Sequence, residues 1–411
     1  MRSRTVDFAC AVVAVGLLAG CAGLATTFLL RSIEHLTYHY VFGSLLEGVT
    51  ASSPVRRAVG PVIGGALAGL GWWILRPRTE VAPLAAAVRN RERIRFWPFT
   101  FDAALQVLVV GSGASLGREV APRQLAVALG NVATGWITRL TERDRQILLA
   151  CAAGAGLGAV YSVPLGGALF TLRIMLKSWH PRAVGAALIS SSLAVSVSSF
   201  ITHDQPNLHW PNPDVSYRLF AYAVALAPLT LMVGLVFNRL MGWAGQRELP
   251  KSWLMIPGIA GAGLFVGVCS HWWPELPGNG RSILNLILAG GMTIESAAII
   301  LVLKLVATAA FLRAGARGGL FTPALATGAA AGTLFVLTVN AMAGTHYGVP
   351  AIALAGSAGV LAITQNAPLW AAIFVWELAR PPLWLSLVFL AAAASTYGLR
   401  LVVRRLPLQR A

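Results

Sequence analysis

The stretch Gly318-Gly319-Leu320-Phe321-Thr322-Pro323 has a counterpart earlier in the chain, Gly117-Arg118-Glu119-Val120-Ala121-Pro122. Each has a Gly five residues before a Pro, and each leads into apolar sequence rich in Ala and Gly, 201 positions apart (122 to 323). A second pair, Pro164 to Phe170 and Pro368 to Phe374, shares its Pro-Leu, Ala and Phe positions 204 apart (164 to 368). Two motifs in the same order at nearly the same offset indicate two related halves.

The composition identifies the solvent of the chain as lipid. Of 411 residues, 56% are hydrophobic and only 11% are charged, with a mean hydropathy of +0.70, whereas soluble proteins have about a quarter charged residues. Several charge-free runs approach or exceed the roughly 20 residues that cross a bilayer: Phe8 to Leu30, Ala58 to Leu75, Ala183 to Thr202 and Leu219 to Asn238. We therefore expect an all-α, polytopic membrane protein.

The two halves predict inverted topology with broken and re-entrant helices. We place the boundary in the polar stretch His203 to Asp214, whose Pro206, Asn207, Pro211 and Asn212 oppose a continuous helix. Residues 1–411 then form one transmembrane domain, with a first half of about 7–202 and a second of about 215–403. Gly and Pro interrupt 150–172 and 353–378, as expected of half-membrane helices.

The net charge of +17 reflects topology rather than nucleic-acid binding, since the basic residues lie between the apolar runs. One basic loop holds six arginines: Arg76, Arg78, Arg89, Arg91, Arg93 and Arg95. A second holds Arg139, Arg143 and Arg145, whereas 202–217 and 338–352 contain none. The positive-inside rule then predicts a multi-pass inner-membrane protein with both termini in the cytoplasm.

Cysteine and histidine predict no metal, cofactor or enzymatic site. Cys10, Cys21, Cys151 and Cys269 occur singly in apolar sequence, where a thiol behaves as a small hydrophobe. His35 and His39 are four apart, but the aromatic residues around them are typical of a membrane interface. No HExxH or CxxC motif occurs.

The repeated Gly-to-Pro stretches are suited to holding an anion. Gly-rich sequence entering a helix leaves the first N–H groups free, with the positive end of the helix dipole behind them. A Pro in the first turn is tolerated because its missing N–H has no partner there. An inverted pair aims two helix starts at one point, and partial charges bind an anion while still releasing it.

These residues resemble the CLC family of chloride channels and chloride/proton exchangers. Arg317 to Gly328 is similar to its GGIFAP filter segment, and Leu116 to Glu119 to the start of its GREGP motif. Leu157 to Phe170, Pro274 to Gly280 and Ile363 to Glu377 resemble further blocks.

The resemblance implies a homodimer in which each subunit has its own chloride pore. It implies that Glu119 is the gating glutamate, and that Leu320 and Phe321 offer backbone N–H groups to the anion. The selectivity filter it implies is Gly117, Arg118, Glu119, Val120, Ala121, Pro122, Gly319, Leu320, Phe321, Thr322 and Pro323. An alternative is that Glu119 simply pairs with Arg118 or another helix.

The chain also departs from the family pattern. Val120-Ala121 after the glutamate suggests a one-residue insertion, and Thr79 to Pro83 lacks the glycines and serine of the inner site. The inner proton glutamate falls on Ile174, beside Arg173. Tyr397 is the one late tyrosine for the pore position, with a membrane-interface role as the alternative. We interpret Glu377 either as a functional residue or as a buried structural partner of a nearby arginine. Arg313 and Arg317 either attract anions to the inner vestibule or flank the membrane on the cytoplasmic side, as the positive-inside rule predicts.

Because Ile174 cannot carry a proton, the sequence favours a passive or weakly coupled anion channel, with chloride as the ion. The alternative is a proton-coupled chloride antiporter whose proton takes another route. An intramembrane enzyme acting on a lipid head group is a third hypothesis, for which Arg118, Glu119 and the basic loops could serve.

Overall fold

A computed structural model describes residues 2–40, 43–79, 81, 84–90, 94–202, 208–211, 216–249 and 252–405. Within these ranges the chain forms helices joined by short connections, and two loops meet in one isolated antiparallel pairing of Gly117 with Gly319. The expected all-α membrane fold is confirmed.

The helices of the first half precede residue 203. They are α1 (Arg2–Tyr38), α2 (Leu45–Ala51), α3 (Pro54–Leu75), α4 (Leu84–Asn90), α5 (Phe96–Gly111), α6 (Val120–Gly135), α7 (Glu142–Tyr161), α8 (Pro164–Leu169), the π-helical turn η1 (Phe170–Leu176) and α9 (Pro181–Thr202).

The helices of the second half begin after residue 215. They are α10 (Leu219–Ala225), α11 (Ala227–Gln246), α12 (Met255–Cys269), α13 (Arg281–Leu288), α14 (Ile294–Arg313), α15 (Phe321–Ala343), α16 (Val349–Gln365), α17 (Pro368–Ala379) and α18 (Leu385–Arg405).

The described helices include seven that are long and apolar enough to cross a membrane. They are α1 from Arg4, α3, α9 to Phe200, α11, α14, α15 and α18. The expected run from Leu219 to Asn238 is not one span: the helix breaks at Leu226, and α11 restarts with Pro228 in its first turn. A proline there lacks the N–H that would continue α10 into α11, which explains the correction.

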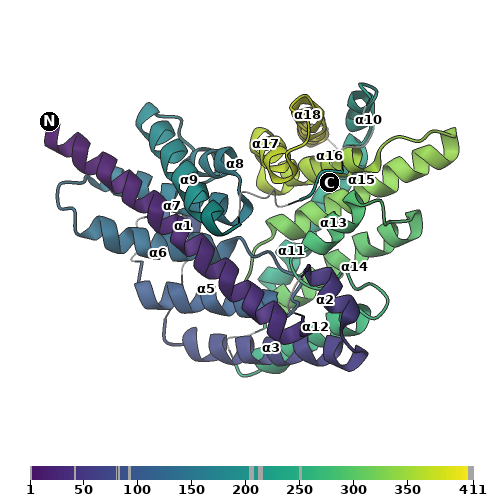
Figure 1. Cartoon of the computed structure of the whole chain (residues 1–411), viewed down its shortest axis with the longest axis horizontal. Helices are drawn as coiled ribbons and strands as arrows, with labels where there is room; N and C mark the ends of the chain where they lie inside the picture. Colours follow the sequence, from purple (N-terminus) through teal and green to yellow (C-terminus); the bar gives the residue numbers. More distant parts are fainter. Residues whose placement is uncertain are drawn as a thin grey trace.

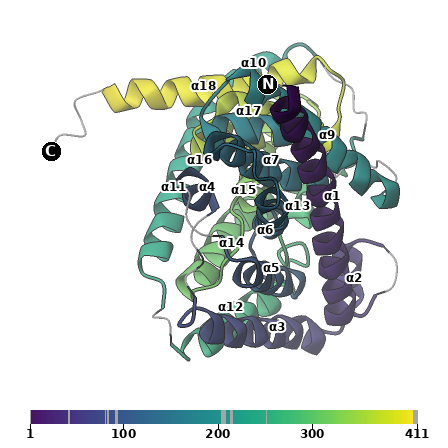
Figure 2. The same ribbon diagram turned by 90° about the vertical axis from the view of Figure 1, so that its left-hand side faces the viewer.

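Most helices of the first half, α5 to α9 among them, lie on the left of Figure 1, and most helices of the second half lie on the right, whereas α2 and α3 extend along the base beneath the second half. The two halves also interlock, because α12 of the second half packs along α3 of the first, at the base of both views (Figure 1, Figure 2). Close approach depends on small residues: a Cβ on Gly263 or Gly267 of α12 would collide with the backbone of α3. Such contacts replace hydrophobic burial as the association force between helices in lipid.

The sequence repeat appears in the structure as a repeated helix break. Helix α7 ends at Ser162 and α16 ends at Asn366, and both residues are left-handed, with φ of 55° and 54°. Two residues later, α8 and α17 each begin with the Pro-Leu pair. These interruptions confirm the broken helices that the sequence predicted, and they bring loops and helix ends into the interior.

Candidate functional site

The two repeated stretches meet through their backbones at the centre of the molecule. The N–H of Gly117 donates to the carbonyl of Gly319 at 2.6 Å, and the N–H of Gly319 donates to the carbonyl of Gly117 at 2.7 Å. A Cβ on either glycine would collide with the carboxylate of Glu119. A side chain at either position would displace the carboxylate of Glu119, which fills the space between the loops.

Each loop leads directly into a helix start. Glu119 is the N-cap of α6 and Leu320 is the N-cap of α15, and the proline of each motif is the third helical residue. The first-half motif is therefore as long as its partner, in keeping with the one-residue insertion inferred from Val120-Ala121. Two helix starts therefore lie within one cluster, as the repeat predicted.

The carboxylate of Glu119 occupies the helix start of the other half. Its Oε1 accepts a hydrogen bond from the N–H of Phe321 at 2.6 Å, and its Oε2 accepts one from the hydroxyl of Thr322 at 3.2 Å. The residue is fully buried, at 0% exposure. A buried carboxylate therefore lies at the positive end of α15, where the helix dipole favours negative charge.

Tyr161, at the end of α7, supplies another hydroxyl to the same carboxylate. Its oxygen lies 3.3 Å from Oε2 of Glu119 and 2.7 Å from the hydroxyl of Thr322. The sequence interpretation missed this tyrosine, although it stands three residues before the repeated Pro164. The two hydroxyls and the N–H of Phe321 form a set of donors around one oxyanion.

Arg123 places a full positive charge behind this carboxylate. Its Nε donates to the backbone carbonyl of Glu119 at 2.6 Å, and its guanidinium lies over the rings of Phe170 and Phe321, 5.0 and 4.8 Å from their centroids. The side chain is buried, at 8% exposure. None of the ion pairs among the described residues includes Arg123, so cation–π contacts and a backbone oxygen stabilise its charge.

An aromatic cluster continues from this guanidinium. Phe321 contacts Trp370 edge-on, Trp370 stacks on Phe374 with centroids 4.9 Å apart, and Phe374 contacts Tyr161 edge-on. The indole N–H of Trp370 donates to the carbonyl of Gly166. The cluster therefore joins α7, α8, α15 and α17 into one rigid wall beside the carboxylate.

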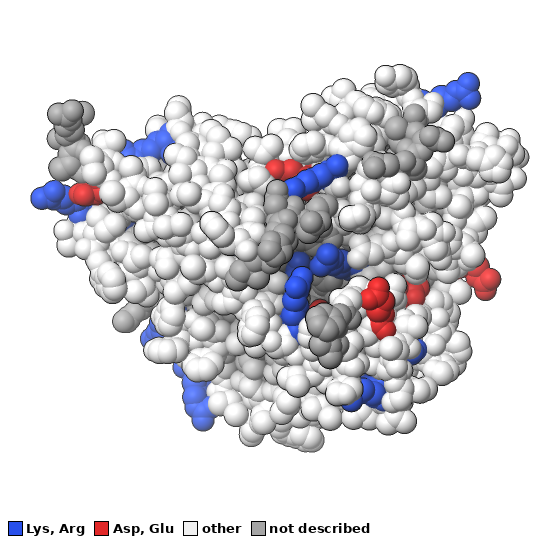
Figure 3. Space-filling model, viewed as in Figure 1, with Lys and Arg blue, Asp and Glu red and all other residues white. Residues whose placement is uncertain are grey.

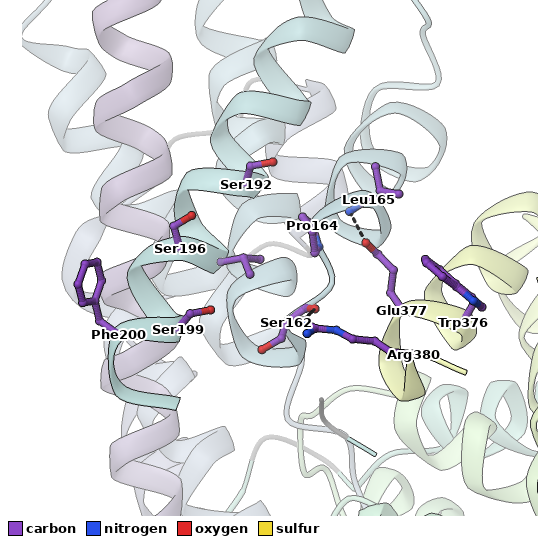
Figure 4. A pocket seen from close by; sticks show the side chains of 11 residues that line it. Ser162, Pro164, Leu165, Ser192, Ser196, Ser199, Phe200, Trp376, Glu377 and Arg380 are labelled. Atoms are coloured by element: carbon purple, nitrogen blue, oxygen red, sulfur yellow. Dashed lines mark hydrogen bonds between the residues drawn. The ribbon is translucent and has the colours of Figure 1, made fainter. Parts of the chain in front are cut away.

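Glu377 repeats the relationship of Glu119 in the opposite direction. It lies on α17 of the second half, and its carboxylate accepts the N–H groups of Leu165 at 2.9 Å and Gly166 at 2.5 Å, at the start of α8 in the first half. Figure 4 shows this carboxylate turned toward Leu165, beside a cavity of about 800 Å³ that α9 borders with Ser192, Ser196 and Ser199. The carboxylate thus bonds a helix start, and the charge of the nearby Arg380 acts on it as well.

The inner segment Thr79 to Pro83 is described only at Thr79 and Val81, so Glu80, Ala82 and Pro83 lie outside the described residues. Val81 is buried, and its carbonyl accepts a hydrogen bond from Arg317 at 3.1 Å. Arg76 similarly donates to the carbonyl of Gly315 at 2.7 Å. The arginines around the second filter stretch therefore anchor it to the first half.

Two predicted positions lie apart from the carboxylate cluster. The hydroxyl of Tyr397 donates to the side-chain oxygen of Asn366 at 2.9 Å, at the end of α16. Ile174 lies on η1 and is partly buried, and Arg173 beside it is exposed. The structure brings Glu119, Phe321, Thr322, Gly117 and Gly319 together, and the tyrosine that contacts this cluster is Tyr161.

Comparison with known proteins agrees with this geometry. The profile of a family described as voltage gated chloride channel matches residues 64–400. A curated relative, the voltage-gated ClC-type chloride channel ClcB of Escherichia coli O17:K52:H18 (strain UMN026 / ExPEC), is 30% identical over 374 residues, covering 89% of this chain and 88% of its own.

Solved structures are also similar. A slow cyanobacterial Cl⁻/H⁺ antiporter matches with a TM-score of 0.77 at 18% identity, covering 98% of this chain and 99% of its own. A CLC-type fluoride/proton antiporter matches with a TM-score of 0.74 at 17% identity, covering 96% and 95%. At these sequence identities the structural matches show that the fold is shared, and they carry no conclusion about function.

Proposed function

Since this chain belongs to the family of voltage-gated chloride channels, a family of anion transport proteins, we propose that it exchanges a small anion, chloride first, for protons. The single observation that carries the proposal is the carboxylate of Glu119 on the N–H of Phe321. An ionised carboxylate there competes with a transported anion for the same donors. A protonated carboxyl binds them weakly and leaves, so proton binding and anion binding are linked.

Arg123 strengthens this linkage. The buried guanidinium of Arg123 bonds the backbone carbonyl of Glu119 and also interacts with the negative charge of that residue. When Glu119 takes a proton, the guanidinium loses this part of its compensation in a medium of low dielectric constant, which is costly unless another anion enters. The arginine therefore favours an exchange in which the carboxylate and the free anion alternate.

Similar proteins include both channels and antiporters. The curated relative at 30% identity is named a channel, whereas two of the similar structures are those of proton antiporters. Ile174, at the inner proton position of the family, is the residue that favoured a passive channel. For antiport, we propose that protons reach Glu119 by a route that does not use Ile174, such as water.

The deciding experiment is a dual flux measurement on purified protein in liposomes loaded with chloride. Antiport predicts that chloride efflux drives proton uptake in fixed proportion, and that a proton gradient alone drives chloride movement. Chloride efflux without proton movement would establish the passive channel instead. Repeating the assay with fluoride and nitrate identifies the preferred anion. A family of channels and transporters gives no support to the lipid-head-group enzyme.

We further propose a homodimer that uses the face of α9. Ser192 and Ser196 are exposed and four residues apart, on one side of a serine-rich helix. Small polar residues at this spacing are typical of contacts between membrane helices. Ser196→Trp should shift the purified protein from dimer to monomer in light scattering, whereas Ser395→Trp on α18 serves as the control.

We also propose how the protein is oriented in the membrane. The protein is a multi-pass membrane protein, and its arginine-rich loops place both termini in the cytoplasm. A fusion of alkaline phosphatase after Arg405, active only outside the cytoplasm, should be inactive.

A further inference from the structure

A second polar pocket lies beside the carboxylate cluster, separate from the Glu119 site. It has a volume of about 350 Å³ and is lined by the end of α1, the start of α2, the filter residue Arg118 and the start of α13. Its basic members are Arg31, Arg118 and Arg281, from three separate segments. Figure 3 shows basic side chains gathered in a hollow near the middle of the face it presents.

The charges of this pocket are unbalanced. Three guanidiniums face one carboxylate, that of Glu34, which accepts a hydrogen bond from the hydroxyl of Tyr40. His35 also lines the pocket, with its ring edge-on against Tyr40. The arginines therefore hold more positive charge than the protein neutralises.

Arg281 is the most informative member, because it begins α13 after the left-handed Gly280. Its Nε is buried and has no hydrogen-bond partner among the described residues. Burial and the neighbouring charge of Arg118 lower the pKa of Arg281 to about 10. A buried guanidinium nitrogen without an acceptor is costly, and a bound anion supplies that acceptor.

The pocket communicates with the carboxylate through Arg118 and Tyr161. The guanidinium of Arg118 lies over the ring of Tyr161, 5.2 Å from its centroid, and donates to the carbonyl of Val160 at 3.2 Å. The hydroxyl of the same tyrosine bonds Glu119. The two sites are thus separated by one aromatic ring.

We propose that the pocket between Arg118 and Arg281 is a second anion-binding site, where a hydrated inorganic anion waits before it replaces the carboxylate of Glu119. That this ligand is the transported anion rests on the proposed function. The existence of an anion site in the pocket does not depend on it.

The chemistry of the lining defines the ligand. Guanidinium groups present paired N–H donors that match planar and tetrahedral oxyanions, and Asn279, Ser282 and Asn285 add neutral polar groups. The volume exceeds that of a bare halide, so chloride is bound with part of its water shell. The site accepts halides and small oxyanions such as nitrate, and it concentrates them next to the gate.

The test of the site is crystallographic, with bromide as the probe. Crystals of the wild-type protein in bromide should give an anomalous peak near Nε of Arg281, even though Glu119 occupies its own site. Arg281→Gln should remove the peak, Arg281→Lys should retain part of it, and Arg404→Gln, at the exposed end of α18, should leave it unchanged. No peak in wild-type protein, or a full peak in Arg281→Gln, would overturn the proposal.

A kinetic test separates capture from the gate. In liposomes, Arg281→Gln should raise the KM for the anion on one side of the membrane by about tenfold, the loss expected for a charge-assisted hydrogen bond. Maximal turnover and proton coupling should stay as in wild type. A fall in turnover at unchanged KM would contradict a waiting site. If wild-type protein moves no anion at all, the proposed function fails, while the bromide peak still decides whether the site exists.

Discussion

The carboxylate of Glu119 in the first half bonds the backbone N–H of Phe321 in the second half at 2.6 Å, 202 residues further along the chain. The reciprocal contact joins Glu377 of the second half to the N–H groups of Leu165 and Gly166 in the first. Each half therefore closes a helix start of the other with an acidic side chain. Only the first of these contacts includes a filter stretch.

Replacing Glu119 should open the site to anions permanently. In Glu119→Ala the N–H of Phe321 and the hydroxyl of Thr322 lose their acceptor, so an anion can bind without displacing a side chain. We expect faster chloride efflux from liposomes and no proton movement with it. Glu295→Ala, at the exposed start of α14, is the matched control. Unaltered flux and coupling in Glu119→Ala would show that this carboxylate is not the gate.

Removing the hydroxyls should weaken the hold on the carboxylate. Tyr161→Phe deletes the donor at 3.3 Å, and Thr322→Val deletes the donor at 3.2 Å. A hydrogen bond to a charged group contributes about 1.5 kcal/mol or more, so chloride turnover should change about tenfold.

The two hydroxyl oxygens lie 2.7 Å apart, so that one hydroxyl can donate its single proton either to the other or to the carboxylate. Their effects should therefore not add in the double variant. Turnover, and the ratio of chloride to nitrate flux, are measured in the same liposome assay. Additive effects would indicate that the hydroxyls act at separate places.

Glu377→Gln should destabilise the protein more than it alters ion selectivity. The amide still offers one acceptor to the N–H groups of Leu165 and Gly166, but it loses the charge that favours a helix start. We expect a loss of about 1–2 kcal/mol, seen as a lower melting temperature in detergent. Arg380→Gln tests the arginine interpretation, because a larger loss there than in Glu377→Gln would make the ion pair the main contact.

The contacts of Asp144 should make the stability of the protein depend on pH, because they join the ends of α1, α7 and α9. Its carboxylate bonds Thr141 in a capping box and pairs with Arg182 at 2.9 Å and Arg4 at 3.3 Å. Burial by itself raises the pKa of Asp144, but the hydrogen bonds from Thr141 and the charges of Arg182 and Arg4 outweigh it and hold the pKa below its ordinary value.

A carboxyl group whose pKa is lowered by folding stabilises the fold at any pH above its ordinary pKa, which is about 4. This contribution is lost as the pH falls through the lowered pKa. Asp144→Asn should therefore lower the melting temperature at pH 7 by the equivalent of about 2 kcal/mol. The difference between variant and wild type should shrink below about pH 4. An equal difference at pH 7 and pH 3 would rule out the charge as its source.

Local sequence motifs predicted the part of the site that consists of backbone groups, namely the two helix starts and the loops that lead into them. The Gly-to-Pro repeats located both helix starts, and the lone glutamate in one of them identified the side chain between the loops. Tyr161 and Arg123 could not be found this way, because their contacts depend on how α7 and α6 pack and on which way each side chain points. An isolated tyrosine or arginine in apolar sequence carries no periodic signal.

The expectations that failed have the same origin. The run from Leu219 to Asn238 is apolar throughout, yet α10 ends at Ala225 and α11 begins at Ala227, with Pro228 in its first turn. The sequence interpretation considered only an arginine as the partner of Glu377 and did not foresee the two backbone donors at the start of α8. A comparison of residue types does not reveal which backbone groups will bond a side chain, although backbone groups hydrogen-bond several of the buried charged side chains in this fold.

The account depends most directly on the claim that the carboxylate of Glu119 stands in the place of the transported anion at the start of α15. Crystals of Glu119→Gln and of wild-type protein, grown in bromide, test it by anomalous diffraction. We predict a bromide peak within hydrogen-bonding distance of the N–H of Phe321 in the variant and none there in wild type. An empty position beside Phe321 in the variant, at bromide concentrations that support flux, would contradict the claim.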